Sequence, residues 1–477
     1  MITYIPHEYQ RTAIEWVKSK PRCGLFLDMG LGKTVITLTA LQDLINGCDI
    51  STALVVAPKK VAETTWATEA AKWSHLQGVR VVPILGDATR RAKAANTPAD
   101  VYVIARDNLS WLINTHHRGQ PTYDAIIIDE LTSFKNHRAL RSRALRIAST
   151  YATRVVGLTG TPSPNGLLDL WAQIFAIDLG ERLGKSFAKF RDLYFVTQTV
   201  NHIPIRSTPK AGADKVIRGR ISDICLSMQA ADYLTLPDCN TITEYVPLPP
   251  KVQKSYKEFE RSQVLHVSDN LKGASKAVLA ASAAALLNKL SQYANGAIYD
   301  EEHNAHEVHA EKLNKIAEIA EGANASGSGL LVFYQYQHDA QRLLRHLKDK
   351  RVRIYAGAED LQAWNAGEID VLLAHPASTA YGLNMQQGGH YIAWLGTGYN
   401  LEYYQQANAR LYRQGQAHPV IIYRVLCPDT VDIQAAAAID RKANTQQALL
   451  DHLSALVQQY RSCTDQTQTT APTTEPA

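Results

Sequence analysis

Short apolar runs, each bounded by polar or glycine-containing segments, recur along this chain in two separate series. The first series comprises Cys23–Asp28, Ala53–Pro58, Val101–Ala105, Ala125–Glu130 and Arg154–Gly160. The second comprises Leu330–Tyr334, Val352–Gly357, Val371–His375, Tyr391–Gly396 and Val420–Leu426. Continuous apolar strands separated by helical patterns are typical of parallel sheets that helices cover on both faces. The sequence therefore predicts an α/β fold with two parallel-sheet lobes.

The regular spacing of apolar runs is interrupted between the two series, and this interruption indicates how the chain is divided into lobes. We expect a first lobe over residues 1–235, with a mostly helical elaboration from about residue 165. An Ala-rich stretch, Gly273–Gly296, favours a helical linker or protrusion over residues 236–300, followed by a second lobe over 301–455. Residues 456–477 are rich in Thr, Gln and Pro, a composition typical of a disordered tail.

Composition limits the compartment and the partners of this chain. The six cysteines form no CxxC pair, which favours a reducing compartment over a disulfide framework. The N-terminus lacks the pattern of a secretory signal, and no apolar run approaches the roughly 18 residues of a membrane span. We therefore expect a soluble, cytoplasmic protein with no membrane partner. A net charge of +5 allows a polyanionic partner, and any nucleic-acid contact must come from a local basic patch.

The segment Asp28–Thr34, DMGLGKT, stands between an apolar run and a helical pattern, which is the context of a phosphate-binding loop. Its backbone would close around the phosphates of ATP, Lys33 would reach the β- and γ-phosphates, and the Thr34 hydroxyl would bind Mg²⁺. Leu27 occupies the place of the usual first glycine. The alternative is a glycine-rich turn with an exposed lysine. The loop residues expected to contact nucleotide are Met29, Gly30, Leu31, Gly32, Lys33 and Thr34.

The fourth apolar run ends in two acids, Asp129 and Glu130. Carboxylates at the carboxyl end of a parallel strand lie on the sheet edge where doubly wound folds bind ligands. Asp129 would hold Mg²⁺, and Glu130 would orient or deprotonate the attacking water. The next run ends in LTGTP, Leu158–Pro162, whose hydroxyls could bond these acids. A solvated helix start is the alternative for the two acids.

A segment between the last two apolar runs of the second series carries two arginines. QANARLYRQGQ, Gln406–Gln416, places Arg410 and Arg413 at i and i+3, which predicts that both lie on one helical face. An arginine from a facing domain stabilises the charge that develops on the γ-phosphate. The alternative is an ordinary solvated basic helix.

The order of these segments, with YQ at Tyr9–Gln10 and GLN at 382–384, resembles the Swi/Snf-like DNA translocases of helicase superfamily two, in a compact bacterial or phage form. The resemblance extends from Tyr9 to about Asp440. It implies two RecA-like lobes, ATP and Mg²⁺ as cofactors, and double-stranded DNA as the partner. It also implies roles for individual residues: Gln10 on adenine, Gly382 on nucleotide, Lys59, Lys60, Ser378 and Thr379 on nucleic acid, and Arg413 as the arginine finger.

The chain departs from the family pattern at three places. The acidic motif reads DELT, Ala409 replaces an aspartate, and YNLEYYQQ replaces the usual Trp-Asn-Pro turn. Three other functions stay open at this point: a strand-separating or RNA-directed helicase, a P-loop small-molecule kinase, and a DNA-binding scaffold that does not hydrolyse ATP.

Overall fold

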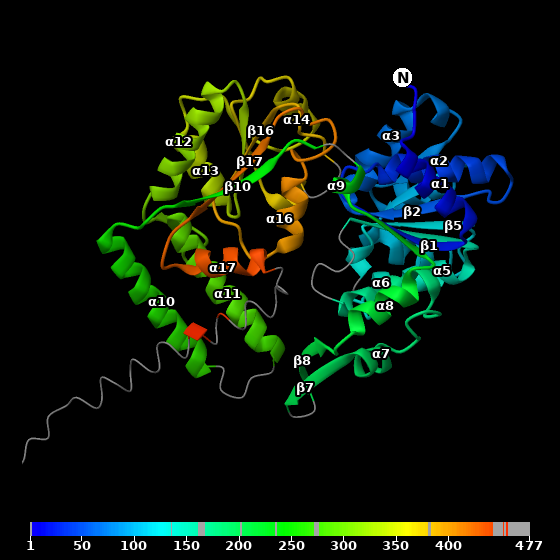
Figure 1. Cartoon of the computed structure of the whole chain (residues 1–477), viewed down its shortest axis with the longest axis horizontal. Helices are drawn as coiled ribbons and strands as arrows, with labels where there is room; N and C mark the ends of the chain where they lie inside the picture. Colours follow the sequence, from blue (N-terminus) through cyan, green and yellow to red (C-terminus); the bar gives the residue numbers. More distant parts are fainter. Residues whose placement is uncertain are drawn as a thin grey trace, which may run out of the picture. The chain divides into compact units, whose positions relative to one another are not determined.

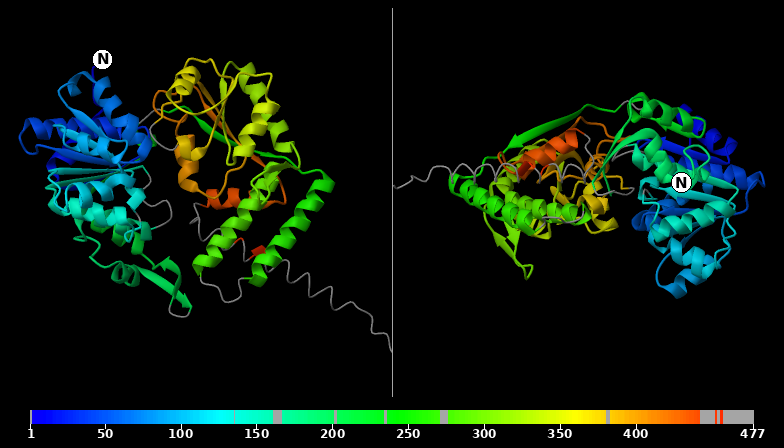
Figure 2. Two further views of the ribbon diagram at one scale, coloured as in Figure 1. Left: turned by 180° about the vertical axis from the view of Figure 1, so that it is seen from behind. Right: turned by 90° about the horizontal axis from the view of Figure 1, so that it is seen from below.

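The computed structural model describes residues 2–134, 136–160, 167–200, 203–233, 236–270, 276–379 and 383–441, together with 452, 455 and 456. The tail expected over 456–477 lies outside these ranges except for residue 456. The chain divides into two compact units, Met1–Thr235 and Leu236–Ala477. Each contains one large parallel sheet with helices on both faces (Figures 1 and 2). The predicted two-lobe α/β fold is confirmed.

The sheet of the first unit has seven strands in the order β3-β4-β2-β5-β6-β1-β9, and every neighbouring pair is parallel. In chain order the strands are β1 (Arg22–Leu27), β2 (Ala53–Ala57), β3 (Val81–Ile84), β4 (Val101–Ala105), β5 (Ala125–Asp129), β6 (Arg154–Thr159) and β9 (Cys225–Met228). Five of them coincide with the five predicted apolar runs. A separate antiparallel hairpin is formed by β7 (Phe195–Val200) and β8 (Ile203–Pro209).

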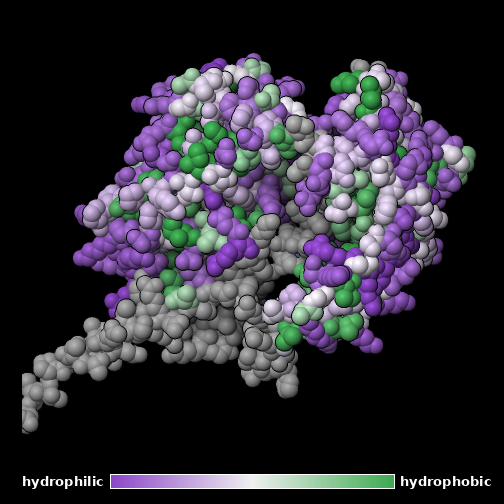
Figure 3. Space-filling view, viewed as in Figure 1, coloured by the Kyte–Doolittle hydropathy of each residue, from purple (hydrophilic) through white to green (hydrophobic). Residues whose placement is uncertain are grey.

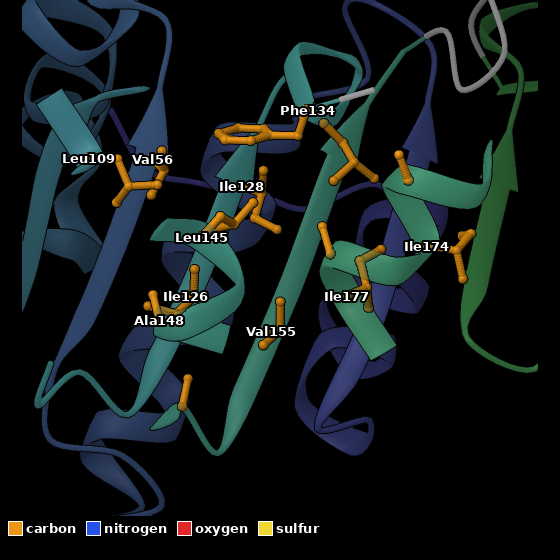
Figure 4. Packing of buried hydrophobic residues seen from close by; sticks show 14 of the residues in the cluster. Val56, Leu109, Ile126, Ile128, Phe134, Leu145, Ala148, Val155, Ile174 and Ile177 are labelled. Carbon is orange, nitrogen blue, oxygen red and sulfur yellow. The ribbon is translucent and has the colours of Figure 1, made fainter. Parts of the chain in front are cut away.

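Helices pack on both faces of this sheet because its central strands are buried on both sides. One face packs against α5 and α6, where Ile126, Ile128 and Val155 meet Leu145 and Ile177 (Figure 4). The helices of this unit are α1 (Glu8–Ser19), α2 (Lys33–Asn46), α3 (Trp66–Lys72), α4 (Ala88–Ala95), α5 (Leu140–Tyr151), α6 (Leu168–Asp178), α7 (Phe187–Tyr194), α8 (Ala213–Ile221) and α9 (Ala230–Tyr233). The short helical turns are η1 (Val61–Thr65), η2 (Ser74–Leu76), η3 (Arg106–Asn108), η4 (Trp111–His116) and η5 (Leu131–Phe134).

The sheet of the second unit has six parallel strands in the order β10-β17-β16-β13-β15-β14. The strands are β10 (Cys239–Tyr245), β13 (Gly329–Phe333), β14 (Val352–Ile354), β15 (Val371–Ala374), β16 (Gly389–Trp394) and β17 (Val420–Leu426), and a small hairpin pairs β11 (Ala297–Tyr299) with β12 (Ala305–Glu307). The helices are α10 (Pro250–Asn270), α11 (Lys276–Asn295), α12 (Glu311–Ala325), α13 (Gln337–His346), α14 (Ala358–Asn365), α15 (Pro376–Thr379), α16 (Leu401–Asn408) and α17 (Val431–Asp440). One apolar cluster lies on each face of the sheet.

The segment between the two series is less helical than expected. The strand β9 joins the first sheet beside β1, and β10 joins the second sheet beside β17. Both are edge strands, and so is β3, which carries Pro83. An edge strand needs no continuous apolar sequence, because one side of it is not covered by another strand; the residues of β10 are all partly or fully exposed. Their sequences therefore lacked the signal that identified the central strands.

A buried polar network joins α12 and α17 in the second unit. The Lys312 side chain is fully buried, and its Nζ lies 2.5 Å from Asp432 Oδ2. The same ammonium donates to Asn295 Oδ1 and to the Leu395 carbonyl, both at 2.8 Å. Asp432 also accepts from the Cys427 amide at 2.9 Å. The network satisfies two charges that would otherwise be buried at high cost.

Replacing Lys312 by Met should lower the free energy of unfolding of the second unit by about 3–5 kcal/mol, because Asp432 stays buried without its cation. The double variant Lys312→Met/Asp432→Asn should lose less than the sum of the two single changes. Urea unfolding of the four proteins measures this coupling. A loss of unfolding free energy below about 1 kcal/mol in Lys312→Met, the size typical of an exposed ion pair, would contradict a buried, coupled pair.

Candidate nucleotide-binding site

The predicted phosphate loop connects β1 to α2 in a conformation that requires glycine. Gly30 and Gly32 have φ values of 91° and 82°, in the left-handed region that side chains disfavour. A Cβ at Gly32 would also lie 2.7 Å from Gln10 Nε2. Leu31 is fully buried between them. The loop is therefore fixed by its glycines and by one buried leucine, and it ends at the N-terminus of α2, where free N–H groups favour anions.

Lys33 is the first residue of α2, and its ammonium lies back over the loop. Its Nζ donates to the Leu27 carbonyl at 2.7 Å and to the Asp28 carbonyl at 3.3 Å. A Cβ at Gly160, directly after β6, would lie 3.5 Å from this Nζ. The end of β6 thus reaches the phosphate loop. Of the LTGTP segment, residues 161 and 162 lie outside the described residues.

Asp129, the last residue of β5, lies near the same ammonium. Its Oδ2 accepts a hydrogen bond of 2.9 Å from Trp66 Nε1, and the Trp66 side chain is fully buried. Burial raises the pKa of the Asp129 carboxyl, while the Trp66 indole and the positive charge of Lys33 oppose that rise. The fold thus brings together Lys33 and Asp129, which stand far apart in the sequence.

Glu130 leaves the strand in a conformation that is rare for its residue type. Its φ is 59°, in the left-handed region. The chain turns there, because the Ser133 amide donates to the Glu130 carbonyl at 2.9 Å. The carboxylate is held as well, since Thr132 Oγ1 donates to Glu130 Oε1 at 2.8 Å. Residues kept in such strained conformations cluster at functional sites, which makes Glu130 a candidate for one.

Gln10 lies on α1 and connects that helix to the phosphate loop. Its side chain is 5% exposed, and Nε2 donates to the Leu31 carbonyl at 3.3 Å. Its Oε1 accepts from Tyr4 Oη at 3.2 Å and from the His7 amide at 3.0 Å. Gln10 is thus within reach of the loop, and its contact with adenine stays a prediction.

The predicted magnesium ligands fit this metal. Among the described residues, no group of three or more His, Cys, Asp or Glu is placed to hold a metal ion. Mg²⁺ needs no such cage, because it is usually bound through one or two protein oxygens together with substrate phosphates and water. Thr34, partly exposed in the first turn of α2, and Asp129 are suitable donors of this kind.

In the second unit, the prediction that Arg410 and Arg413 lie on one helical face is wrong. Helix α16 ends at Asn408, so Arg410 and Arg413 lie in the turns that follow it. The helix stops because the next amides bond three residues back, Arg410 N to Ala407 O and Leu411 N to Asn408 O. The two guanidinium groups are nevertheless brought together.

Both arginines donate to the carbonyl oxygen of Leu383, Arg413 at 2.8 Å and Arg410 at 3.4 Å. Leu383 follows Gly382, which lies outside the described residues. Arg410 is 5% exposed and also bonds the Gln406 carbonyl at 2.8 Å, whereas Arg413 is partly exposed. Arg413 is therefore the better placed of the two to meet a ligand.

The four predicted nucleic-acid contacts differ in exposure. Lys59 and Lys60 are exposed directly after β2, and Lys59 Nζ lies 3.9 Å from Glu63. Ser378 is partly exposed in α15, with its hydroxyl on the His375 carbonyl at 2.7 Å. Thr379 is fully buried, and its hydroxyl donates to the Pro376 carbonyl at 3.1 Å. The Thr379 side chain is thus not presented at the surface.

Sequence reasoning missed two residues that contact the acidic pair. No sequence pattern assigned Trp66 a role at the site, and Thr132 was noted only as the last residue of DELT. No spacing rule connects Trp66 to Asp129, because the two residues meet only when β5 and the helix α3 after β2 pack together. Thr132 lies two residues after Glu130, but its contact depends on the left-handed turn.

These features define the class of the protein: an α/β protein whose first parallel sheet carries a phosphate loop and an adjoining acidic pair. The chain matches the sequence profile of the SNF2-related domain over residues 9–297. It is 37% identical over 469 residues to putative protein p41 of Acyrthosiphon pisum secondary endosymbiont phage 1, covering 95% of this chain and 98% of that protein. The chain belongs to the SNF2-related family.

Two more distant similarities accompany these. The uncharacterized ATP-dependent helicase MG018 of Mycoplasma genitalium is 22% identical over 459 residues, which cover 91% of this chain but 41% of that protein. The Sulfolobus solfataricus SWI2/SNF2 ATPase core, solved in complex with double-stranded DNA, is 18% identical with a TM-score of 0.45, covering 98% of this chain and 96% of that one. Family membership makes the chain a helicase-related, ATP-hydrolysing enzyme. Across its described helices, none is long and apolar enough to cross a membrane.

Replacing Trp66 by Phe should raise the Mg²⁺ concentration for half-maximal ATP hydrolysis by about tenfold, because Asp129 is the predicted Mg²⁺ ligand and loss of a hydrogen bond that orients such a ligand weakens metal affinity to that extent. Titration of turnover against Mg²⁺ measures the effect. Trp73→Phe is the matched control, since Trp73 Nε1 donates to Glu69 at 2.8 Å and not to Asp129. An equal Mg²⁺ requirement in the two variants would exclude this role for Trp66.

Proposed function

We propose that this protein is a DNA-stimulated ATPase that couples hydrolysis to movement along double-stranded DNA. The observation that carries the ATPase part is the convergence of Lys33 and Asp129 at one edge of the first sheet, with Glu130 next in the chain. The DNA part is supported by the motif order, which resembles that of Swi/Snf-like translocases. Membership of the SNF2-related family agrees with both parts.

The residues of the first unit would act on ATP in sequence. The loop amides and Lys33 would bind the β- and γ-phosphates, and Gln10 would read adenine. Thr34 and Asp129 would hold Mg²⁺, which would neutralise negative charge on the phosphate oxygens. Glu130 would orient a water molecule for attack on the γ-phosphorus and accept its proton, so that the β–γ bond breaks to give ADP and phosphate.

The second unit separates this proposal from its rivals. A small-molecule kinase would not need a second parallel sheet in which two arginines donate to one carbonyl oxygen. A scaffold that does not hydrolyse ATP is disfavoured because Lys33, Asp129, Glu130 and Arg413 are all present. A strand-separating or RNA-directed helicase shares the same residues and is distinguished by experiment.

Turnover of ATP should be measured without nucleic acid and with duplex DNA, single-stranded DNA and RNA. Duplex DNA should stimulate most, and salt should weaken the stimulation, because phosphate contacts release counterions. RNA should be poorer, since A-form helices present different grooves. Glu130→Gln, which keeps the shape but removes the base, should bind ATP without hydrolysing it. Equal or better stimulation by RNA would favour the RNA-directed helicase, and normal turnover in Glu130→Gln would remove the carboxylate from the mechanism.

Arg413→Ala should leave ATP and DNA binding nearly intact while cutting DNA-stimulated turnover by about 10³ or more, the usual effect of losing an arginine finger. Arg413→Lys should restore little, because a point charge cannot reproduce the bidentate fork of a guanidinium. Binding titrations beside steady-state turnover measure both effects. Because Arg413 belongs to the second unit, the variant tests whether both units take part in hydrolysis. If Arg413→Ala turned over normally, Arg410 would be the next candidate.

A further inference from the structure

The positive charge of this chain is concentrated in one short segment. Residues 185–220 contain eight Lys or Arg and two Asp or Glu, a net charge of +6, whereas the whole chain carries +5. All other residues together therefore carry a net charge of −1. This segment, here called the basic module, contains α7, the β7–β8 hairpin and α8. It includes none of the residues of the candidate nucleotide site.

The fold holds the helices of the basic module against the core and directs their charges outward. The buried face of α8 consists of Ala213, Ile217 and Ile221, which share one apolar cluster with Phe190 and Tyr194 of α7. Its opposite face carries exposed Lys215, Arg218 and Arg220. Figure 3 shows largely hydrophilic residues on this part of the first unit, with a few apolar ones among them.

Two contacts show that α7 and α8 lie close together. Lys210, before α8, donates from Nζ to the Asp192 and Leu193 carbonyls at 2.8 and 3.0 Å. The Arg220 guanidinium lies 6.0 Å from the Tyr194 ring. The charged residues of both helices therefore belong to one continuous surface and not to two separate ones.

Within the described part of the chain, several of these charges have no ionic partner. Arg218 pairs with Asp214 at 2.7 Å, and Arg191 pairs with Asp192 at 3.1 Å. Lys185, Lys189 and Lys215 are exposed, and none has an ion-pair partner among the residues that the structure describes. Unpaired cations gathered on one surface repel one another, and a polyanion with regularly spaced charges relieves that repulsion.

We infer that the basic module is a binding surface for DNA phosphates, separate from the nucleotide site and independent of base sequence. The inference rests on the proposed function, because it takes DNA as the polyanion. Flexible lysines suit this role, since they meet phosphates as point charges without reading base edges.

Duplex DNA binding should be measured by fluorescence anisotropy over a range of salt concentrations, using the full chain. In Lys189→Gln/Lys215→Gln, the slope of log K against log salt should flatten by about 1.8, and affinity near 0.1 M salt should fall at least about tenfold, because each lost phosphate contact removes about 0.9 from the slope. ATP turnover without DNA should not change.

Lys93→Gln/Lys348→Gln is the matched control, since both lysines are exposed outside the module and the change in net charge is the same. This control should keep the wild-type slope. Equal slopes in the two double variants would overturn the inference while leaving the proposed function standing. Failure of the wild-type protein to bind duplex DNA would instead overturn the proposed function, and the inference with it.

Discussion

The candidate site depends on a parallel sheet that brings the Lys33 ammonium to the edge where Asp129 lies, so that the positive charge of Lys33 lowers the pKa of that carboxyl against the effect of burial. Burial alone would favour a neutral Asp129, and the nearby cation and the Trp66 indole oppose that effect. The two residues meet because β1 and β5 both pair with β6 in a parallel sheet. Their carboxyl ends therefore share one edge, which is where such sheets bind ligands.

The central strands were predictable from sequence because burial on both faces demands continuous apolar runs. The strand β5, for example, is recognisable from AIIID alone. The edge strands were less uniform: β14 was recognised from its apolar run, whereas CNTITEY, which became β10, carried no comparable signal because its residues are all partly or fully exposed. The end of α16 could not be predicted from the sequence either. The Gln416 side chain donates to three backbone carbonyls, some from distant segments, and these hydrogen bonds hold the turns that follow the helix. Long-range hydrogen bonds of this kind leave no periodic trace in a sequence.

The candidate site shows the same division between local and tertiary signals. The phosphate loop is a local motif, and Gly30 and Gly32 have the left-handed φ values that its turns need, although Leu27 replaces the usual first glycine. The pairing of Arg410 with Arg413 was expected from helical periodicity, yet the structure achieves it through the shared Leu383 carbonyl. The sequence pattern therefore grouped Arg410 and Arg413 correctly, but helical periodicity was not the reason. What links them is the loop before β16 and not the helix before them.

The acidic motif illustrates how a departure from a family pattern can still satisfy the chemistry. Asp129 and Glu130 are adjacent carboxylates, and each receives a donor from a different neighbour, Trp66 and Thr132. A hydroxyl at position 132 reaches the Glu130 carboxylate because the left-handed turn folds the chain back over two residues. The fourth letter of the motif therefore supplies a hydrogen-bond donor, and a threonine serves for that purpose. The left-handed conformation of Glu130 and the hydrogen bond from Thr132 occur together in this structure as two parts of one local arrangement.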